Sequence, residues 1–149
     1  MEEELDRLAS EMFRTFARFE YALKAAGFHY GEGPAEPNWR AFAQSIPEAL
    51  KSPKIPLAEA VAYILKHPPK KQMVIDDELQ WSEAPPETDL HSDLVLLYVR
   101  RVRNNLFHGG KFNGKWFEPE RSEQLLRHSL TVLNACLDAS APLRDAYSN

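Results

Sequence analysis

Residues 90–107, Leu-His-Ser-Asp-Leu-Val-Leu-Leu-Tyr-Val-Arg-Arg-Val-Arg-Asn-Asn-Leu-Phe, carry the pattern that decides the fold. The first half is apolar on nearly all sides, which is typical of the central helix of a bundle. In the second half the apolar positions narrow to a stripe of Val95, Val99, Val102 and Leu106. Thr88 or Asp89 can cap the start, and Gly109-Gly110 supplies a left-handed stop after the end. The stretch therefore predicts a long helix.

Further helices are predicted on both sides, where apolar residues recur at three- and four-residue spacing. They cover about residues 2–26, 39–50, 57–66 and 119–139, with a possible extra turn at 143–147 after Pro142 ends the last of them. Residues 72–81 fit either a small hairpin or an ordered loop. The predicted fold class is all-α: one domain over residues 1–149, a helical bundle with an elaborated middle connection at about 31–88.

The composition is that of an ordinary globular protein, with 149 residues, 44% apolar residues and 27% charged residues. No apolar run approaches membrane-spanning length, and the acidic start Met1-Glu2-Glu3-Glu4 is unlike a signal peptide. The single cysteine, Cys136, lies among aliphatic residues and is interpreted as buried filler. Because a single cysteine cannot form an internal disulfide, a cytoplasmic location is expected. The lack of a long apolar run predicts no membrane partner.

Charge is distributed unevenly along the chain. The formal net charge is −4, yet residues 94–117 contain no acidic residue. Five basic residues fall within this stretch: Arg100, Arg101, Arg103, Lys111 and Lys115. A basic island on an acidic body predicts a local anion site. The alternative is a helix C-terminus enriched in basic residues that complement its dipole, which accounts for some of these charges.

The end of the 90–107 helix also carries a chemically capable set of side chains. Arg103, Asn104, Asn105 and His108 lie within six residues, and together an arginine fork and a titratable imidazole can cleave a phosphodiester without a metal ion. On one straight helix Arg103 and His108 point about 140° apart. Either the helix unwinds near Gly109, or two copies of the chain contribute to one composite cleft. The structural alternative is that His108 caps the helix and Arg103 pairs with a surface carboxylate.

The words Arg103-Asn104-x-x-x-His108, within Arg-Asn-Asn-Leu-Phe-His-Gly-Gly-Lys, resemble the signature of HEPN domains (higher eukaryotes and prokaryotes nucleotide-binding). Residues 16–27 also resemble the first helix of that family, and the middle of the chain resembles nothing identifiable. The resemblance implies an up-and-down helical bundle that is commonly homodimeric. Many members are metal-independent endoribonucleases of toxin–antitoxin, phage-defence or RNA-processing systems. In one toxin branch a modified tyrosine stands two residues after the histidine, where this chain has Gly110.

Carried over residue by residue, the resemblance implies catalytic roles for Arg103, Asn104 and His108. His108 would move a proton at the ribose 2′-OH or the leaving 5′-oxygen, while Arg103 holds the phosphate and Asn104 orients one of them. The products would be a 2′,3′-cyclic phosphate and a 5′-OH. The RNA-binding candidates are Arg100, Arg101, Asn105, Lys111, Lys115 and Trp116.

No metal and no cofactor are expected, because the other histidines (His29, His67, His91 and His128) lack ligand spacing and no phosphate-cradling glycine loop is present. The expected partners are RNA, a second copy of the chain and an antitoxin or other protein. The alternative function is a catalytically silent HEPN-like module for dimerisation or nucleotide binding. The net negative charge of the chain favours this alternative function slightly.

Overall fold

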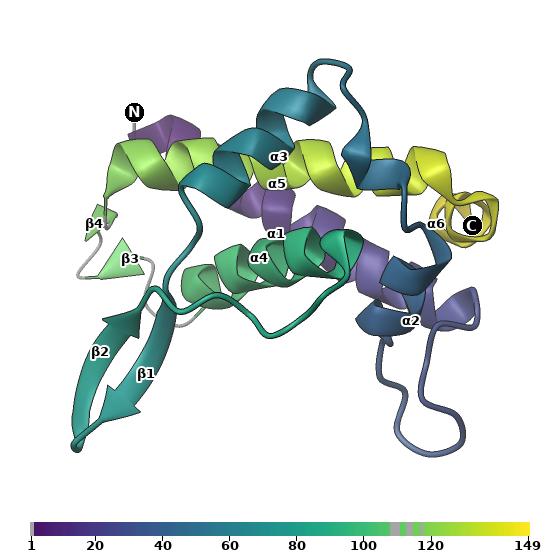
Figure 1. Ribbon diagram of the computed structural model, residues 1–149, viewed down its shortest axis with the longest axis horizontal. Helices are drawn as coiled ribbons and strands as arrows, with labels where there is room; N and C mark the ends of the chain where they lie inside the picture. Colours follow the sequence, from purple (N-terminus) through teal and green to yellow (C-terminus); the bar gives the residue numbers. More distant parts are fainter. Residues whose placement is uncertain (1, 108–110, 113–114, 117) are drawn as a thin grey trace.

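The computed structural model describes residues 2–107, 111–112, 115–116 and 118–149 (Figure 1). The elements in chain order are α1 (Glu2–Ala25), α2 (Trp39–Ser45), a 3₁₀ turn η1 (Ala49–Lys51), α3 (Leu57–Lys66), β1 (Lys71–Ile75), β2 (Glu78–Ser82), α4 (His91–Phe107), β3 (Lys111–Phe112), β4 (Lys115–Trp116), α5 (Pro119–Ala139) and α6 (Ala141–Ser148). Helices dominate, as the sequence predicts. The helices expected at 2–26, 57–66, 90–107 and 119–139 are confirmed to within a residue at each end.

Two helix boundaries differ from the prediction, and proline explains both. The helix expected over 39–50 ends at Ser45, because Pro47 restricts the residue before it and has no N–H to continue the ladder. Pro142, expected to end a helix, instead lies in the first turn of α6, where its missing N–H costs nothing. Ser140 caps that helix by accepting a hydrogen bond from the Leu143 N–H at 3.4 Å.

The stretch at 72–81, which the sequence leaves open between hairpin and loop, is an antiparallel hairpin. Its strands pair from Lys71 with Ser82 to Ile75 with Glu78. The two turn residues, Asp76 and Asp77, have φ of 52° and 63°, as a type I′ hairpin turn requires. Aspartate tolerates this left-handed conformation, but an Asp-Asp pair is a weaker sequence signal for such a turn than Asn-Gly. With a second short pair, β3 and β4, the fold is mainly rather than purely helical.

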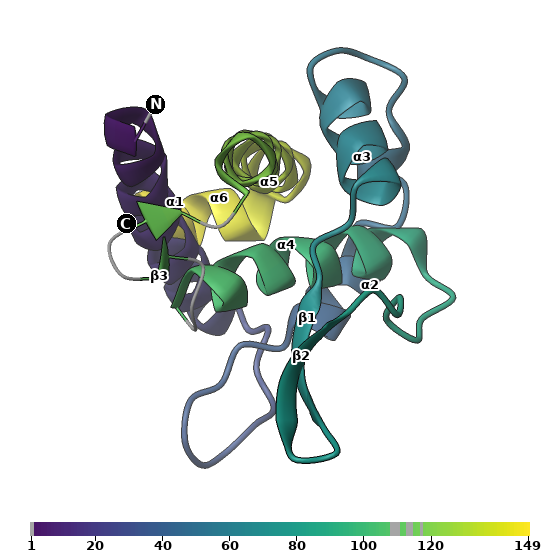
Figure 2. The ribbon, with the colours of Figure 1, turned by 90° about the vertical axis from the view of Figure 1, so that its left-hand side faces the viewer.

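Four helices form the body of the molecule. In the end-on view, α5 lies between α1 and α3, and α4 runs beneath them (Figure 2). One continuous apolar core joins these helices, and α1 contributes Leu5, Leu8, Met12, Phe16, Phe19, Ala22 and Leu23 to it. Cys136 on α5 is fully buried in this core, as predicted, and burial raises the pKa of its thiol. Within the described residues, no helix combines the length and apolar character that crossing a bilayer requires.

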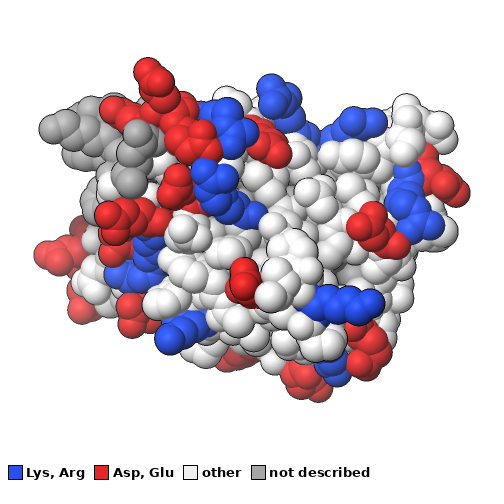
Figure 3. All heavy atoms as spheres, turned by 90° about the horizontal axis from the view of Figure 1, so that it is seen from above, with Lys and Arg blue, Asp and Glu red and all other residues white. Residues whose placement is uncertain are grey.

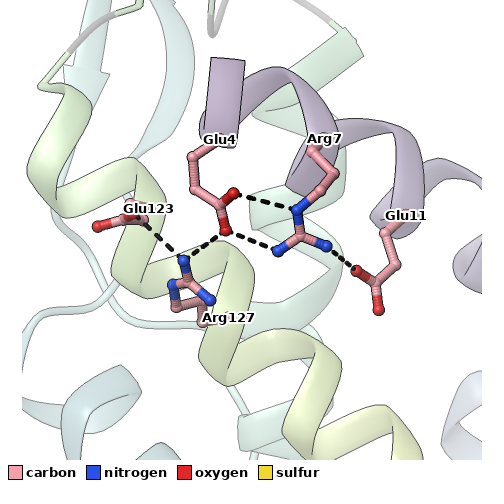
Figure 4. A network of polar contacts seen from close by, with 5 residues as sticks. All are labelled: Glu4, Arg7, Glu11, Glu123 and Arg127. Atoms are coloured by element: carbon pink, nitrogen blue, oxygen red, sulfur yellow. Dashed lines mark hydrogen bonds and ion pairs between the residues drawn. The ribbon is translucent and has the colours of Figure 1, made fainter. Parts of the chain in front are cut away.

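A charged network clamps the start of α1 to α5 (Figure 4). The Glu4 carboxylate accepts hydrogen bonds from Arg7 Nη2 and from Arg127 Nη2, both at 2.6 Å. Arg127 belongs to α5, where its Nη2 also lies 3.4 Å from Glu123 Oε1. Hydrogen bonds from Arg7, reinforced by Arg127, lower the pKa of Glu4 to about 2 against the opposing effect of desolvation. The network therefore ties the two helices together only while Glu4 is ionised.

This network predicts a specific acid sensitivity. Because the pKa of Glu4 is lower in the folded chain than in the unfolded one, its contribution to stability is complete above the unfolded value, about 4.3. The contribution disappears as the pH falls from there towards 2. The wild-type free energy of unfolding is expected to decrease over this window more than that of Glu4→Gln, measured by urea unfolding at several pH values. An NMR titration midpoint for Glu4 above 4 would contradict the prediction, and Arg127→Gln is expected to raise that midpoint.

Candidate functional site

The side chain of Arg103 lies between aromatic rings at the C-terminal end of α4. Its Cζ is 4.4 Å from the centroid of the Phe107 ring, one turn further along the helix, and 5.4 Å from that of Phe16 on α1. The Phe107 ring in turn meets Phe13 of α1, with 5.6 Å between centroids. Guanidinium groups stack favourably on such faces. The sequence analysis missed these aromatic partners, although the four-residue spacing of Arg103 and Phe107 on one helix face was a usable signal.

Arg103 is also paired with its neighbour in the motif. Arg103 Nη1 donates to Asn104 Oδ1 at 3.1 Å, so the two motif residues hold each other. Within the described ranges, no carboxylate lies at ion-pair distance from Arg103, and its Nε is buried without a hydrogen-bond partner. The surface carboxylate considered as a partner for Arg103 is thus not found there. A guanidinium that is held in place and has no carboxylate partner among the described residues favours binding of an anion through its remaining N–H groups.

An open groove lies beside this guanidinium, between α1 and the end of α4. It has a volume of about 540 Å³ and is lined by Asp6, Ala9, Ser10, Phe13, Arg14, Leu106 and Phe107. The Phe13 side chain is 52% exposed and that of Phe107 is 48% exposed. Two half-exposed aromatic rings at the edge of a charged site suit a contact with another macromolecule.

The other basic residues of α4 point in different directions. Arg100 lies over the ring of Trp39, with its Cζ 5.7 Å from the centroid, on the side of α4 that faces α2. Arg101 donates from Nη1 to the Ala84 carbonyl oxygen at 3.0 Å, on the side of the β1–β2 hairpin. On the side of the molecule where α3 and α5 lie, seen from above, acidic and basic side chains are interspersed (Figure 3). The three arginines of the basic island therefore lie on different faces of α4.

Asn105 lies on the hairpin side with Arg101, because the two are four residues apart. Its Nδ2 donates to the Lys70 carbonyl oxygen at 2.7 Å. Arg101 and Asn105 thus have structural contacts, and their assignment to RNA stays a prediction. His108 lies outside the described residues, as does the Gly109-Gly110 stop, and so do the side chains of Lys111, Lys115 and Trp116. Of the three predicted catalytic residues, the structure places Arg103 and Asn104 together.

The remaining histidines make local contacts. His67 and His128 flank the Tyr63 ring at 4.7 and 4.9 Å between centroids, and burial lowers the pKa of His128. His91 Nε2 lies 3.3 Å from the Leu50 carbonyl oxygen, and His29 Nδ1 accepts a hydrogen bond from the Gly31 N–H. Among the described residues, no group of three potential ligands is arranged to hold a metal ion.

A separate cavity of about 230 Å³ lies on the opposite side of Leu106, between α4, α5 and the β1–β2 hairpin. Its walls are formed by Pro69, Lys70, Trp81, Val102, Asn105, Leu106, Glu118, Arg121, Ser122, Leu125 and Leu126. Arg121 Nη2 donates to the Pro68 carbonyl oxygen at 2.5 Å and so fixes the chain at the cavity's edge. Nothing in the sequence signalled this cavity, because its walls come from separate segments.

Comparison with known proteins gives no match: no family model, no curated protein and no solved structure is detectably similar to this chain.

Proposed function

We propose that the protein is a metal-independent endoribonuclease of HEPN type. In this proposal a ribose 2′-OH loses its proton to a His108 imidazole, and the 2′-oxygen attacks the adjacent phosphorus. The bond to the 5′-oxygen breaks, and an imidazolium returns a proton to that oxygen. The products are a 2′,3′-cyclic phosphate and a 5′-OH. Because the nucleophile belongs to RNA, DNA is not cleaved.

The observation that carries the proposal is the state of Arg103. Its guanidinium is held by Phe16, Phe107 and Asn104, and no carboxylate among the described residues neutralises it. A cation fixed in this way is preorganised for the charge that grows on the phosphate oxygens in the transition state. Its place on the last turns of α4, five residues before His108 in the sequence, supports the role that the motif gives it in phosphate binding.

A homodimer completes the proposed site. Arg103 lies over the ring of Phe107, which lines the groove together with Phe13, and a second copy packed on this groove would bury both rings. A two-fold axis there brings the ends of two α4 helices together, so that each chain supplies an arginine and a histidine to one cleft. In this arrangement Arg103 of one chain can face His108 of the other, although the two side chains point apart on a single helix.

The same groove favours a second candidate, a catalytically silent module that dimerises or binds a nucleotide for a separate partner protein. The half-exposed Phe13 and Phe107 rings suit dimerisation whether or not the cleft is reactive. In that case Arg103 binds a phosphate without turnover. The chain would then act as the platform of a toxin–antitoxin or defence system, with its partner supplying the chemistry.

The decisive experiment incubates wild type and His108→Ala with a mixed-sequence RNA in EDTA and analyses the product ends. If the proposal holds, the wild-type protein cleaves the RNA and leaves 2′,3′-cyclic phosphate and 5′-OH ends, whereas His108→Ala does not cleave it. His108→Ala should keep the wild-type melting temperature, because a catalytic group contributes to the transition state rather than to the fold. Absence of cleavage by a folded dimer, combined with RNA or nucleotide binding that Arg103→Ala abolishes, would select the silent module.

A further inference from the structure

The β1–β2 hairpin, hereafter the arm (residues 71–82), projects from the helical body (Figures 1 and 2). Its register places Val74 opposite Leu79 and Gln72 opposite Trp81, so the three apolar side chains share one face. They are exposed by 68% (Val74), 67% (Leu79) and 38% (Trp81). In the described chain the sheet holds two strands, so each has an edge that no strand pairs. An exposed apolar hairpin with open edges is a template for another strand.

The arm is fixed to the body through both of its legs. The carbonyl oxygen of Lys70, just before β1, accepts from Asn105, and that of Ala84, just after β2, accepts from Arg101. Both donors lie one turn apart on α4. A two-stranded hairpin alone is marginally stable in water, so these anchors give the arm a defined position. A defined position lowers the entropic cost of binding a partner.

The apolar face of the arm leads into the cavity beneath it. Trp81 belongs to both, since it lies on that face and also lines the cavity with Val102, Leu106 and Leu125. A volume of about 230 Å³ accepts an apolar side chain. Peptide complexes obtain much of their affinity from such an anchor in a pocket beside main-chain hydrogen bonds.

The charge around this surface selects the partner. The arm itself holds Lys71 against the three carboxylates of Asp76, Asp77 and Glu78 at its turn, and the cavity is lined by Lys70 and Arg121 together with Glu118. At the cavity, Lys70 Nζ lies 3.9 Å from an oxygen of Glu83 and 3.9 Å from one of Glu118. Those two carboxylates are 76% and 55% exposed and keep capacity for a further cation. The carboxylates at the hairpin turn attract a cationic peptide and repel an RNA backbone.

We propose that the arm and its cavity bind an extended segment of a partner protein in which Lys or Arg alternates with apolar residues. The segment adds a strand to an open edge of the arm and places one apolar side chain in the cavity. Its cationic side chains meet the carboxylates around Lys70 and at the hairpin turn. This site is separate from the Arg103 groove, and binding to it is independent of RNA cleavage.

The test selects a displayed library of random peptides on the full-length wild-type chain, with counter-selection on Val74→Ser/Leu79→Ser. The enriched sequences are expected to alternate Lys or Arg with apolar residues. A synthetic consensus peptide should bind wild type in calorimetry about tenfold or more tightly than it binds the double variant. Tyr21→Ser is the matched control, because this side chain is 65% exposed on α1, and it should bind as wild type does.

A second variant tests charge without touching the apolar face. Asp77→Asn/Glu83→Gln should remain folded by circular dichroism, weaken the peptide and reduce the salt dependence of binding. The proposal is overturned by no enrichment, by acidic or uncharged consensus sequences, or by equal affinity for wild type and Val74→Ser/Leu79→Ser. It is also overturned if sedimentation shows that this double variant loses self-association of the wild-type chain, because a second copy would then occupy the arm.

Discussion

For the proposed endoribonuclease, Arg103→Lys is expected to lower kcat/KM for RNA cleavage by about 100-fold or more while leaving the fold intact. The ammonium group keeps the charge but loses the planar fork that binds two phosphate oxygens. It also cannot lie flat between Phe16 and Phe107, so the charge is no longer held in one place. Single-turnover cleavage of a defined RNA measures the effect, with the melting temperature as the check on folding.

Arg144→Lys is the matched control for this variant. Arg144 lies on α6 and donates to the Asp138 carbonyl oxygen, so the exchange makes the same chemical change away from the motif. Its cleavage rate should equal that of wild type. Wild-type activity in Arg103→Lys would contradict the role given to the guanidinium. Unchanged cleavage in Arg103→Ala would remove Arg103 from the site altogether.

Phe19→Ala is expected to cost about 3–5 kcal/mol of unfolding free energy, the largest stability effect predicted here. The Phe19 ring is fully buried and stacks on Trp39, with 5.1 Å between centroids and 3° between planes. It also meets Phe42 edge-on at 5.7 Å. The substitution leaves a cavity between α1 and α2 and removes support from Trp39, over which Arg100 lies. Urea unfolding measures the loss.

Tyr21→Ala gives the comparison on the same helix. Tyr21 is 65% exposed, so its removal should change the unfolding free energy by about 0.5 kcal/mol or less. A cost below about 1 kcal/mol for Phe19→Ala would mean that the aromatic cluster rearranges to fill the space. The cluster of Phe19, Trp39 and Phe42 would then not hold Arg100 in a fixed position.

The two proposed sites share one helix. The side of α4 that carries Arg103 faces α1 and the Phe13–Phe107 groove, whereas the side that carries Arg101 and Asn105 holds the arm. Leu106 lines both the groove and the cavity. A partner bound to the arm would therefore contact a cavity that shares Leu106 with the groove.

The periodicity of apolar residues predicted α1, α3, α4 and α5 because a helix that buries one face needs a repeated spacing, which is a local property. Pro47 and Pro142 were harder to interpret. Proline can end a helix or lie in the first turn of one, and the outcome depends on the cap that precedes it. The hairpin at Asp76-Asp77 stayed undecided because its turn lacks the glycine that marks such turns.

By itself the sequence determined α1, α3, α4 and α5, the burial of Cys136 and the grouping of Arg103 and Asn104 at one helix end, since each depends on neighbours within a turn or two. Only the tertiary structure decided what surrounds them. The ring of Phe16 reaches Arg103 from a segment about ninety residues earlier, and Phe13 on the same helix meets Phe107. Packing also divided the basic residues among the faces of α4 and set the arm over its cavity. Charge along a sequence is one-dimensional, whereas the site depends on which face of a packed helix each side chain occupies.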